Sequence, residues 1–317
     1  MKYSWNKVRD GVVDNLGFQL AKIVRNSNAN RFATRRRYLK AQQRFIKHIA
    51  KEFRVQNLRN IKDKHLESYA KSLKEKECTN QYIKIELSAI RFLHNDIPNT
   101  RNILEDARVF NKRLEVSKSD ADATKIYRAW SKNEIEDMKK IAKKLNRESI
   151  IKIIDVQSEL GLRLDEAVTL KSYQVKIALK RGKIDLSNTK GGVPRVVELS
   201  AEARKILESL DLSRKYCIVP QKYHDKSKIH KFKKSIQNFL YNHREKIQDN
   251  YRESSAHGLK DNQKSALTSH GLRHTFARRK YKEFREMGLS KYDSRREVSE
   301  LLGHHRDNIT RVYISSL

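Results

Sequence analysis

The sequence predicts a mostly α-helical (α+β) protein of two domains, the second of which also carries a small three-stranded antiparallel sheet. Only 10 glycines and 3 prolines interrupt the 317 residues, and such a scarcity of helix breakers favours long helices. Apolar residues recur every three or four positions through most of the chain, which is the period of an amphipathic helix. Residues 173–199 instead hold short runs rich in β-branched residues.

The first domain is expected to begin with two amphipathic helices. A helix over about residues 5–24 would bury an apolar stripe made of Val8, Val12, Leu16, Leu20 and Ile23. The next helix would start at Thr34, a residue type favoured as N-cap, and would have an apolar face and a strongly basic face. The basic face carries Arg35, Arg36, Arg37, Lys40, Arg44 and Lys47.

The rest of the first domain is expected to consist of three shorter helices. Asp63 and Thr79 have side chains that accept hydrogen bonds from the first free amides of a helix, so each is predicted to cap one. The helix after Thr79 would end near Pro98, because proline cannot continue a helix. A last helix is predicted over about residues 103–114.

A linker is expected between the two domains. The segment VSKSDADAT is small, polar and without periodicity, which is typical of an exposed connection. We place the linker at residues 119–126, between a first domain of residues 1–118 and a second of residues 127–317. Ser131 and Glu134 then form an S-x-x-E capping box, which predicts the first helix of the second domain.

The predicted sheet lies within residues 173–199. Three short segments, QVKIAL, KIDL and VPRVVEL, are separated by KRG and KGG, which are typical turn sequences. They predict a three-stranded antiparallel sheet with a lysine, Lys190, on its second turn. Helical spacing returns from Ile206 onward.

The charge of the chain points to a polyanionic partner. Lys and Arg number 70 against 38 Asp and Glu, which gives a formal net charge of +32. Because the basic residues are spread along the whole chain and do not form one amphipathic helix, nucleic acid is a better partner than a membrane surface.

The sequence also favours a cytoplasmic protein. No apolar stretch approaches the roughly 20 residues that span a bilayer, and the first residues lack the apolar region of a signal peptide. Cys78 and Cys217 are far apart and have no C-x-x-C partner, so neither a disulfide framework nor a structural zinc site is expected.

Four segments of the second domain carry candidate chemistry: GLRLDEAVTL, TKGGVPRVVEL, SHGLRHTFARR and LLGHHRDNITRVY. Each alone has an ordinary structural explanation, namely an exposed helix pair, a turn lysine, a second helix pair and a core tyrosine. Their order and spacing are more informative. A G-x-R-x-x-E box, a hairpin lysine, an H-x-L-R-H box and an L-G-H box nine residues before a tyrosine follow one another along the chain.

Together these segments resemble the catalytic domain of the tyrosine recombinases, the family of phage and mobile-element integrases. The resemblance spans roughly residues 131–313, while the first domain agrees only as a basic helical unit of suitable size. It implies a set of catalytic residues, here Arg163, Lys190, His270, Arg273, His304 and the nucleophile Tyr313. It further implies a site-specific recombinase or integrase that forms a 3′-phosphotyrosyl intermediate, acts on double-stranded DNA as a homotetramer on two sites, is a monomer or dimer without DNA, and is cytoplasmic and nucleoid-associated.

The resemblance also implies a role for each residue. Arg163, Arg273 and His304 would bind the scissile phosphate, His270 would accept the tyrosine proton, and Lys190 would protonate the departing 5′-oxygen. Glu166 would support the site by orienting Arg163 or Lys190, and His274 would pack.

Physical chemistry supports this set independently. The transition state of phosphodiester cleavage gains negative charge, which the always-charged fork of an arginine can stabilise. The chain shows neither a carboxylate cluster of the two-metal type nor a phosphate-binding loop, so neither metal nor ATP is expected as a cofactor.

Several alternatives stay open from sequence. The same chemistry serves type IB topoisomerases, and a catalytically silent DNA-binding protein could have kept the fold. The basic face of the second helix could clamp DNA or could be a solvated charged surface. Only four residues follow Tyr313, whereas many family members carry a further docking element there, so either the chain is truncated or another segment couples the protomers.

Overall fold

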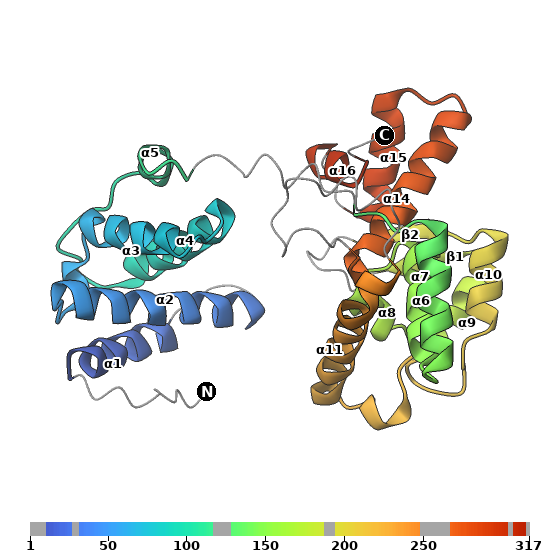
Figure 1. The fold of residues 1–317 in the computed structure, drawn as a ribbon, viewed down its shortest axis with the longest axis horizontal. Coiled ribbons are helices and arrows are strands. Elements are labelled where there is room, and N and C mark those ends of the chain that lie inside the picture. The colour runs from blue at the N-terminus through green and yellow to red at the C-terminus, as the bar shows by residue number, and fades with distance from the viewer. Residues whose placement is uncertain are drawn as a thin grey trace. The chain divides into compact units, whose positions relative to one another are not determined.

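The computed structural model describes residues 11–26, 32–116, 128–186, 194–247, 267–303 and 307–314 (Figure 1). The chain divides into two compact units, residues 1–123 and 124–317. The predicted limits of the linker lie among residues 117–127, outside the described residues, and stay predictions. No helix in the described part of the chain is both long and apolar enough to cross a membrane.

The first unit is a bundle of helices around an apolar core. Its elements are α1 (Gly11–Asn26), α2 (Phe32–Phe53), the 3₁₀ turn η1 (Leu58–Asn60), α3 (Asp63–Glu75), α4 (Asn80–Asp96) and α5 (Ala107–Arg113). Helix α2 packs against α1, α3 and α4. Of the predicted stripe, Leu16 and Leu20 are fully buried and Val12 and Ile23 are half-buried, while Val8 lies outside the described residues.

Two predicted helix caps in this unit, Thr34 and Asp63, differ from the structure. Helix α2 begins at Phe32, so Thr34 lies in its first turn and does not cap it; the preceding Ala33 is the strongest helix former and extends the helix. Lys62 occupies the N-cap position of α3 without a side-chain cap hydrogen bond, and its backbone amide donates to His65 Nδ1 at 3.1 Å. The Asp63 carboxylate instead accepts from the Glu105 amide at 3.1 and 3.2 Å.

The other caps of this unit follow local sequence. Thr79 caps α4 as predicted, because its hydroxyl accepts from the Tyr82 amide at 3.2 Å. Helix α5 begins at Ala107 and not near residue 103. Asp106 caps it, because its carboxylate accepts from the amides of Arg108 and Val109. Ile103 lies before it and is almost fully exposed.

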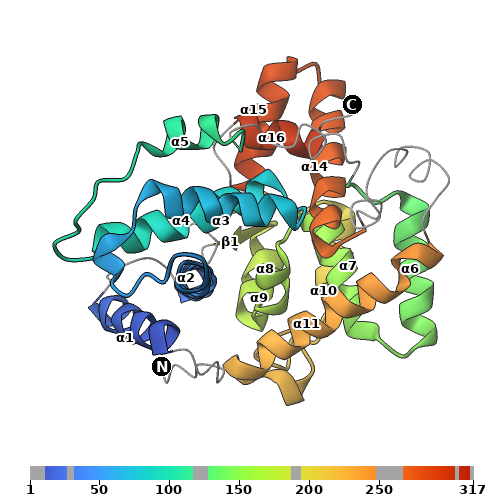
Figure 2. The same ribbon diagram turned by 60° about the vertical axis from the view of Figure 1, so that its left-hand side comes forward.

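The second unit is larger and also mostly helical (Figures 1 and 2). Its helices are α6 (Lys132–Lys144), α7 (Glu148–Leu160), α8 (Leu164–Val168), α9 (Ser172–Arg181), α10 (Ala201–Glu208), α11 (Lys226–His243), α14 (Ser269–Glu286), α15 (Lys291–Leu302) and α16 (Asp307–Ile314), with 3₁₀ turns η3 (Gln221–Tyr223) and η4 (Arg244–Lys246). The Ser131–Glu134 capping box is confirmed by reciprocal bonds of 3.1 and 2.7 Å.

The prediction of a third strand in the sheet is wrong. Among the described residues it has two antiparallel strands, β1 (Lys183–Leu186) and β2 (Arg195–Glu198), and the QVKIAL segment belongs to helix α9. That segment alternates apolar residues, but the core buries Val175 and Ala178, which are three positions apart, and leaves Ile177 exposed. Gly182 then ends the helix in a left-handed conformation (φ 70°) and makes no hairpin turn.

Helix α14 organises the second unit, because it packs against α7, α15 and α16. Its Phe276 ring fills the space beside Gly161, the left-handed residue (φ 61°) that ends α7 and precedes α8. A Cβ at Gly161 would overlap this ring. The glycine is therefore needed both for its φ and for the close approach of α14.

We expect Gly161→Ala to lower the free energy of unfolding by about 2 kcal/mol or more, because strain at positive φ and overpacking against Phe276 add. Gly182→Ala is the matched control, since Gly182 also has positive φ but nothing lies within 4 Å of its Cβ position. Urea denaturation of both variants measures the difference. Equal losses would show that the contact with Phe276 carries no cost.

Candidate active site

The predicted nucleophile and the predicted base are in contact. The Tyr313 hydroxyl on α16 lies 3.2 Å from Nε2 of His270, in the first turn of α14. The two rings are 5.5 Å apart at 65°. Tyr313 is only 6% exposed, and its hydroxyl contacts a histidine of the same chain.

His274, one turn beyond His270, holds the other side of the tyrosine. Its ring stacks on the Tyr313 ring with centroids 4.2 Å apart and planes at 24°. Burial, followed by electrostatic interactions with His270 and Arg128, lowers the pKa of His274 to about 3. His274 is therefore neutral at physiological pH and packs against the nucleophile.

The two predicted arginines converge on one backbone oxygen. Arg163 is the N-cap residue of α8, and its Nη2 lies 3.4 Å from the Leu302 carbonyl oxygen at the end of α15. The fully buried Arg273 of α14 donates to the same carbonyl and to that of Gly161. Guanidinium groups that share one acceptor oxygen can also share an oxygen of a bound anion.

A carboxylate lies beside these arginines. Glu166 accepts from the Arg163 amide at 2.8 Å and from Arg163 Nη1 at 2.9 Å. It also accepts from both terminal nitrogens of Arg195, at 2.9 and 2.5 Å. Burial alone would raise the pKa of Glu166, but the hydrogen bonds and charge of Arg195, aided by Arg163, lower it to about 2.

The charge balance of this cluster favours an anion. Burial, followed by repulsion from Arg195 and Arg163, lowers the pKa of Arg273 to about 9, which still leaves the guanidinium protonated at neutral pH. Arg163, Arg195 and Arg273 thus face the single negative charge of Glu166. A phosphate group would compensate the excess positive charge.

Sequence reasoning missed Arg195, the first residue of β2. Its side chain is only 1% exposed. The strand buries Arg195 and Val197 and exposes Val196 and Glu198. An arginine at an inward position of an alternating strand was the signal that could have revealed it.

Two predicted catalytic residues cannot be placed. Lys190 lies among residues 187–193, and His304 among residues 304–306, both outside the described residues. The segment that contains Lys190 connects β1 to β2, and Leu186 and Arg195 are the paired strand residues nearest to it. Both roles therefore stay predictions.

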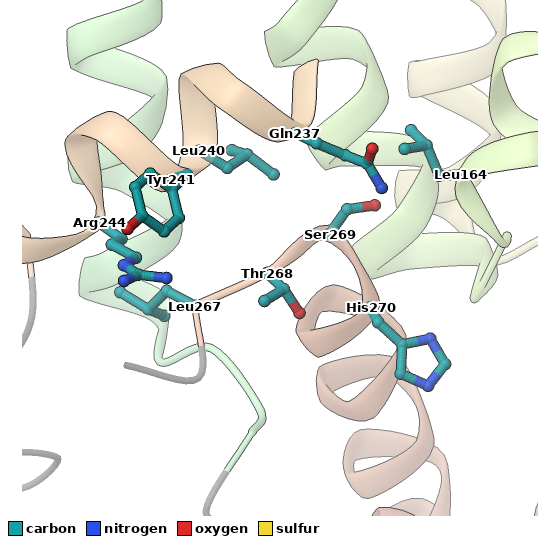
Figure 3. A pocket seen from close by; sticks show the side chains of 9 residues that line it. All are labelled: Leu164, Gln237, Leu240, Tyr241, Arg244, Leu267, Thr268, Ser269 and His270. Carbon is teal, nitrogen blue, oxygen red and sulfur yellow. The ribbon is translucent and has the colours of Figure 1, made fainter. Parts of the chain in front are cut away.

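A pocket of about 330 Å³ lies beside His270 (Figure 3). Its lining consists of Leu164, Gln237, Leu240, Tyr241, Arg244, Leu267, Thr268, Ser269 and His270. The guanidinium of Arg244 lies 4.0 Å from the Tyr241 ring centroid. Gln237 faces Ser269 across the pocket (Figure 3).

One exposed face of α11 leads to this pocket. His230, Lys234, Gln237 and Tyr241 are exposed and recur at helical spacing. The sequence analysis did not single out this helix. Its Lys-rich sequence was a signal, but the connection to His270 depends on residues 30 positions further along the chain.

In the first unit, all six residues of the predicted DNA-binding set are exposed on α2. Arg44 and Lys47 also line a cleft of about 1030 Å³ together with Lys51, Lys64 and Lys71. Arg44 also forms an ion pair within this unit, in which it donates to the buried carboxylate of Glu86 at 3.0 and 2.6 Å.

Within the described ranges, no group of three or more His, Cys, Asp or Glu side chains is placed to hold a metal ion.

Two family models match the chain. Residues 128–317 match the phage integrase family, and residues 13–107 match its N-terminal domain, described as "Phage integrase, N-terminal". No curated protein matches.

Several solved structures share the fold at low sequence identity. The Tn1549 transposon integrase in complex with transposon right end DNA is 15% identical, with 95% of this chain and 94% of that chain covered and a TM-score of 0.61. A lambda integrase tetramer bound to a Holliday junction is 16% identical, with 94% and 76% covered and a TM-score of 0.63. XerH recombinase bound to its difH substrate is 17% identical, with 99% and 96% covered and a TM-score of 0.55. The family match covers more than half of the sequence and confirms the resemblance to tyrosine recombinases, so this chain belongs to the phage integrase family.

Proposed function

We propose that this protein is a site-specific DNA recombinase or integrase of a mobile element, which cleaves and rejoins DNA through a covalent bond to Tyr313. The observation that carries this proposal is the 3.2 Å contact of the Tyr313 hydroxyl with His270, next to two arginines that share one acceptor. A nucleophile within reach of a base, beside fixed cations, is the arrangement that phosphoryl transfer requires.

In the proposed cleavage step, His270 accepts the proton of Tyr313. An unperturbed tyrosine has a pKa near 10, so a base at hydrogen-bond distance is needed at neutral pH. The tyrosine oxygen forms a bond to phosphorus, and the bond from phosphorus to the 5′-oxygen breaks. Lys190 would give a proton to that oxygen, which leaves a 3′-phosphotyrosyl bond and a free 5′-hydroxyl.

The proposed role of Arg163, Arg273 and His304 is to stabilise the charge that grows on the non-bridging oxygens. Arg273 is fully buried and donates to the backbone carbonyls of Gly161 and Leu302, so its guanidinium is held in place before DNA binds. The Arg163 side chain is 16% exposed, so the scissile phosphate could reach this guanidinium from solvent.

The proposed reaction uses neither metal nor ATP. The phosphotyrosyl bond keeps the energy of the phosphodiester, so a 5′-hydroxyl from a partner strand can reverse the step. Cleavage should therefore proceed in EDTA.

The proposed partners are double-stranded DNA sites and further copies of this chain. The similar Tn1549 and XerH structures contain DNA, and the similar lambda integrase forms a tetramer on a Holliday junction. We propose the same assembly here, a homotetramer on two DNA sites and a monomer or dimer without DNA, in the cytoplasm at the nucleoid. The exposed faces of α2 and α11 are the proposed DNA contacts.

Two other functions make different predictions. A type IB topoisomerase-like enzyme would relax supercoiled DNA but would not exchange strands between two sites, and a silent binding protein would do neither. Incubation of the protein with plasmids that carry two copies of its element's ends distinguishes the three. Recombinant products support the proposal, and relaxation alone contradicts it.

We expect Lys47→Ala to weaken DNA binding and to lower the slope of log affinity against log salt by about one, because one phosphate contact is lost. Arg44→Ala should weaken binding too, but should also lower the free energy of unfolding by about 1–3 kcal/mol, because the buried Glu86 loses its cation. Binding titrations at several salt concentrations and urea denaturation measure both effects. An unchanged salt slope in Lys47→Ala would exclude the basic face of α2 as a phosphate contact.

A further inference from the structure

We propose that Arg195 is a positioning residue for the cleavage reaction, which acts through Glu166 to fix the guanidinium of Arg163. This inference rests on the proposed function. It assigns a role to a buried arginine that the six-residue catalytic set does not include.

The hydrogen bonds of Glu166 define the path of this effect. Arg195 donates one terminal nitrogen to each carboxylate oxygen, at 2.9 and 2.5 Å, so it fixes the plane of the carboxylate. One of these oxygens then accepts from Arg163 Nη1 at 2.9 Å, and the other accepts from the Arg163 backbone amide at 2.8 Å. Both the backbone and the side chain of Arg163 are thus tied to a carboxylate that Arg195 orients.

The partners of Arg195 favour an indirect role at the DNA, because both of its terminal nitrogens donate to the charged carboxylate of Glu166, whereas Arg273 donates to neutral backbone carbonyls. The Arg195 side chain is 1% exposed and that of Glu166 is 5% exposed, whereas the Arg163 side chain is 16% exposed. Among these three groups only Arg163 reaches solvent appreciably. We therefore expect the effect of Arg195 on the scissile phosphate to pass through Glu166.

The chemistry requires an arginine at this position. A guanidinium donates two parallel hydrogen bonds to a carboxylate, whereas an ammonium is a point charge that cannot fix the carboxylate plane. Without Arg195, Glu166 would keep only its two hydrogen bonds to Arg163 and would be held less firmly. Small displacements of a group that binds the transition state can cost on the order of a hundredfold in rate.

A double-mutant cycle tests the proposal. The variants are Arg195→Met, Arg195→Lys, Glu166→Gln and the double variant R195M/E166Q, and the readouts are single-turnover cleavage of a nicked DNA substrate, DNA affinity and thermal stability. The double variant removes both buried charges, which is often neutral for stability, so it stays informative if Arg195→Met folds poorly. Arg279→Met is the matched control, because Arg279 forms an ion pair with Glu159 between α14 and α7, away from Tyr313.

We expect Arg195→Met to slow cleavage on the order of a hundredfold while DNA affinity stays within a few-fold of wild type. Arg195→Lys should restore stability but not the cleavage rate. The double variant should be as stable as wild type and should cleave as slowly as Glu166→Gln alone, because both changes interrupt one path. Arg279→Met should cleave at the wild-type rate.

Three results would overturn the inference and leave the proposed function intact. Cleavage by Arg195→Met at the wild-type rate would show that Arg195 does not position the site. A double variant that regains both stability and rate would show that Arg195 only neutralises Glu166. Losses that multiply in the double variant would show that the two residues act independently. A wild-type protein that forms no covalent adduct would overturn the proposed function itself, and the inference with it.

Discussion

Tyr313→Phe is expected to bind DNA with wild-type affinity and to form no covalent protein–DNA adduct. The substitution removes only the hydroxyl that lies 3.2 Å from His270. Phenylalanine keeps the ring that stacks on His274 and the buried volume at the end of α16, so the fold should be unchanged. Gel electrophoresis under denaturing conditions after incubation with nicked DNA measures the adduct.

Tyr281→Phe is the matched control for this experiment. Tyr281 lies on α14, is partly buried against the same core and is not among the proposed catalytic residues. This variant should form adducts like the wild type. An adduct that survives in Tyr313→Phe would refute the assignment of the nucleophile.

Arg163→Ala and Arg273→Lys are each expected to slow cleavage by on the order of a hundredfold or more. Removing one fixed donor to a developing oxyanion typically costs about 2.7–4 kcal/mol of transition-state stabilisation. Lysine at position 273 keeps the charge but cannot donate to two acceptors in the planar geometry that Arg273 uses with Gly161 and Leu302. Single-turnover cleavage rates at saturating protein measure the loss.

Stability must be measured beside these rates, because Arg273 is fully buried. Lysine is preferred to alanine at this position since it leaves a smaller cavity and keeps a donor for the carbonyls. Rates within a few-fold of wild type, in folded variants, would remove Arg163 or Arg273 from the site.

Local sequence signals predicted much of the fold. The Ser131–Glu134 capping box and the Thr79 cap depend on residues three positions apart, and both are confirmed. The third strand was wrong because QVKIAL satisfies both a strand and a helix period, and only the core decides that Val175 and Ala178 are buried together. Short apolar runs carry this ambiguity in general.

The resemblance to tyrosine recombinases predicted several residues that the structure brings together. His270 and Tyr313 are 43 positions apart in sequence, yet the structure places them in contact, and Arg163 and Arg273 share an acceptor. The spacing could not reveal Arg195, whose partner Glu166 is 29 positions away on another element. Nor could it reveal that Arg44 is bound to Glu86. Such pairs depend on tertiary packing and not on local pattern.

The most direct test of the central claim is to trap and map the covalent intermediate. The protein is incubated with nicked duplexes that carry the ends of its own element, in EDTA, and the denaturant-resistant adduct is digested and analysed by peptide mass. The proposed function predicts a 3′-phosphonucleotide on the peptide that contains Tyr313. Tight binding of the same DNA without any adduct, or an adduct on another residue, would contradict it.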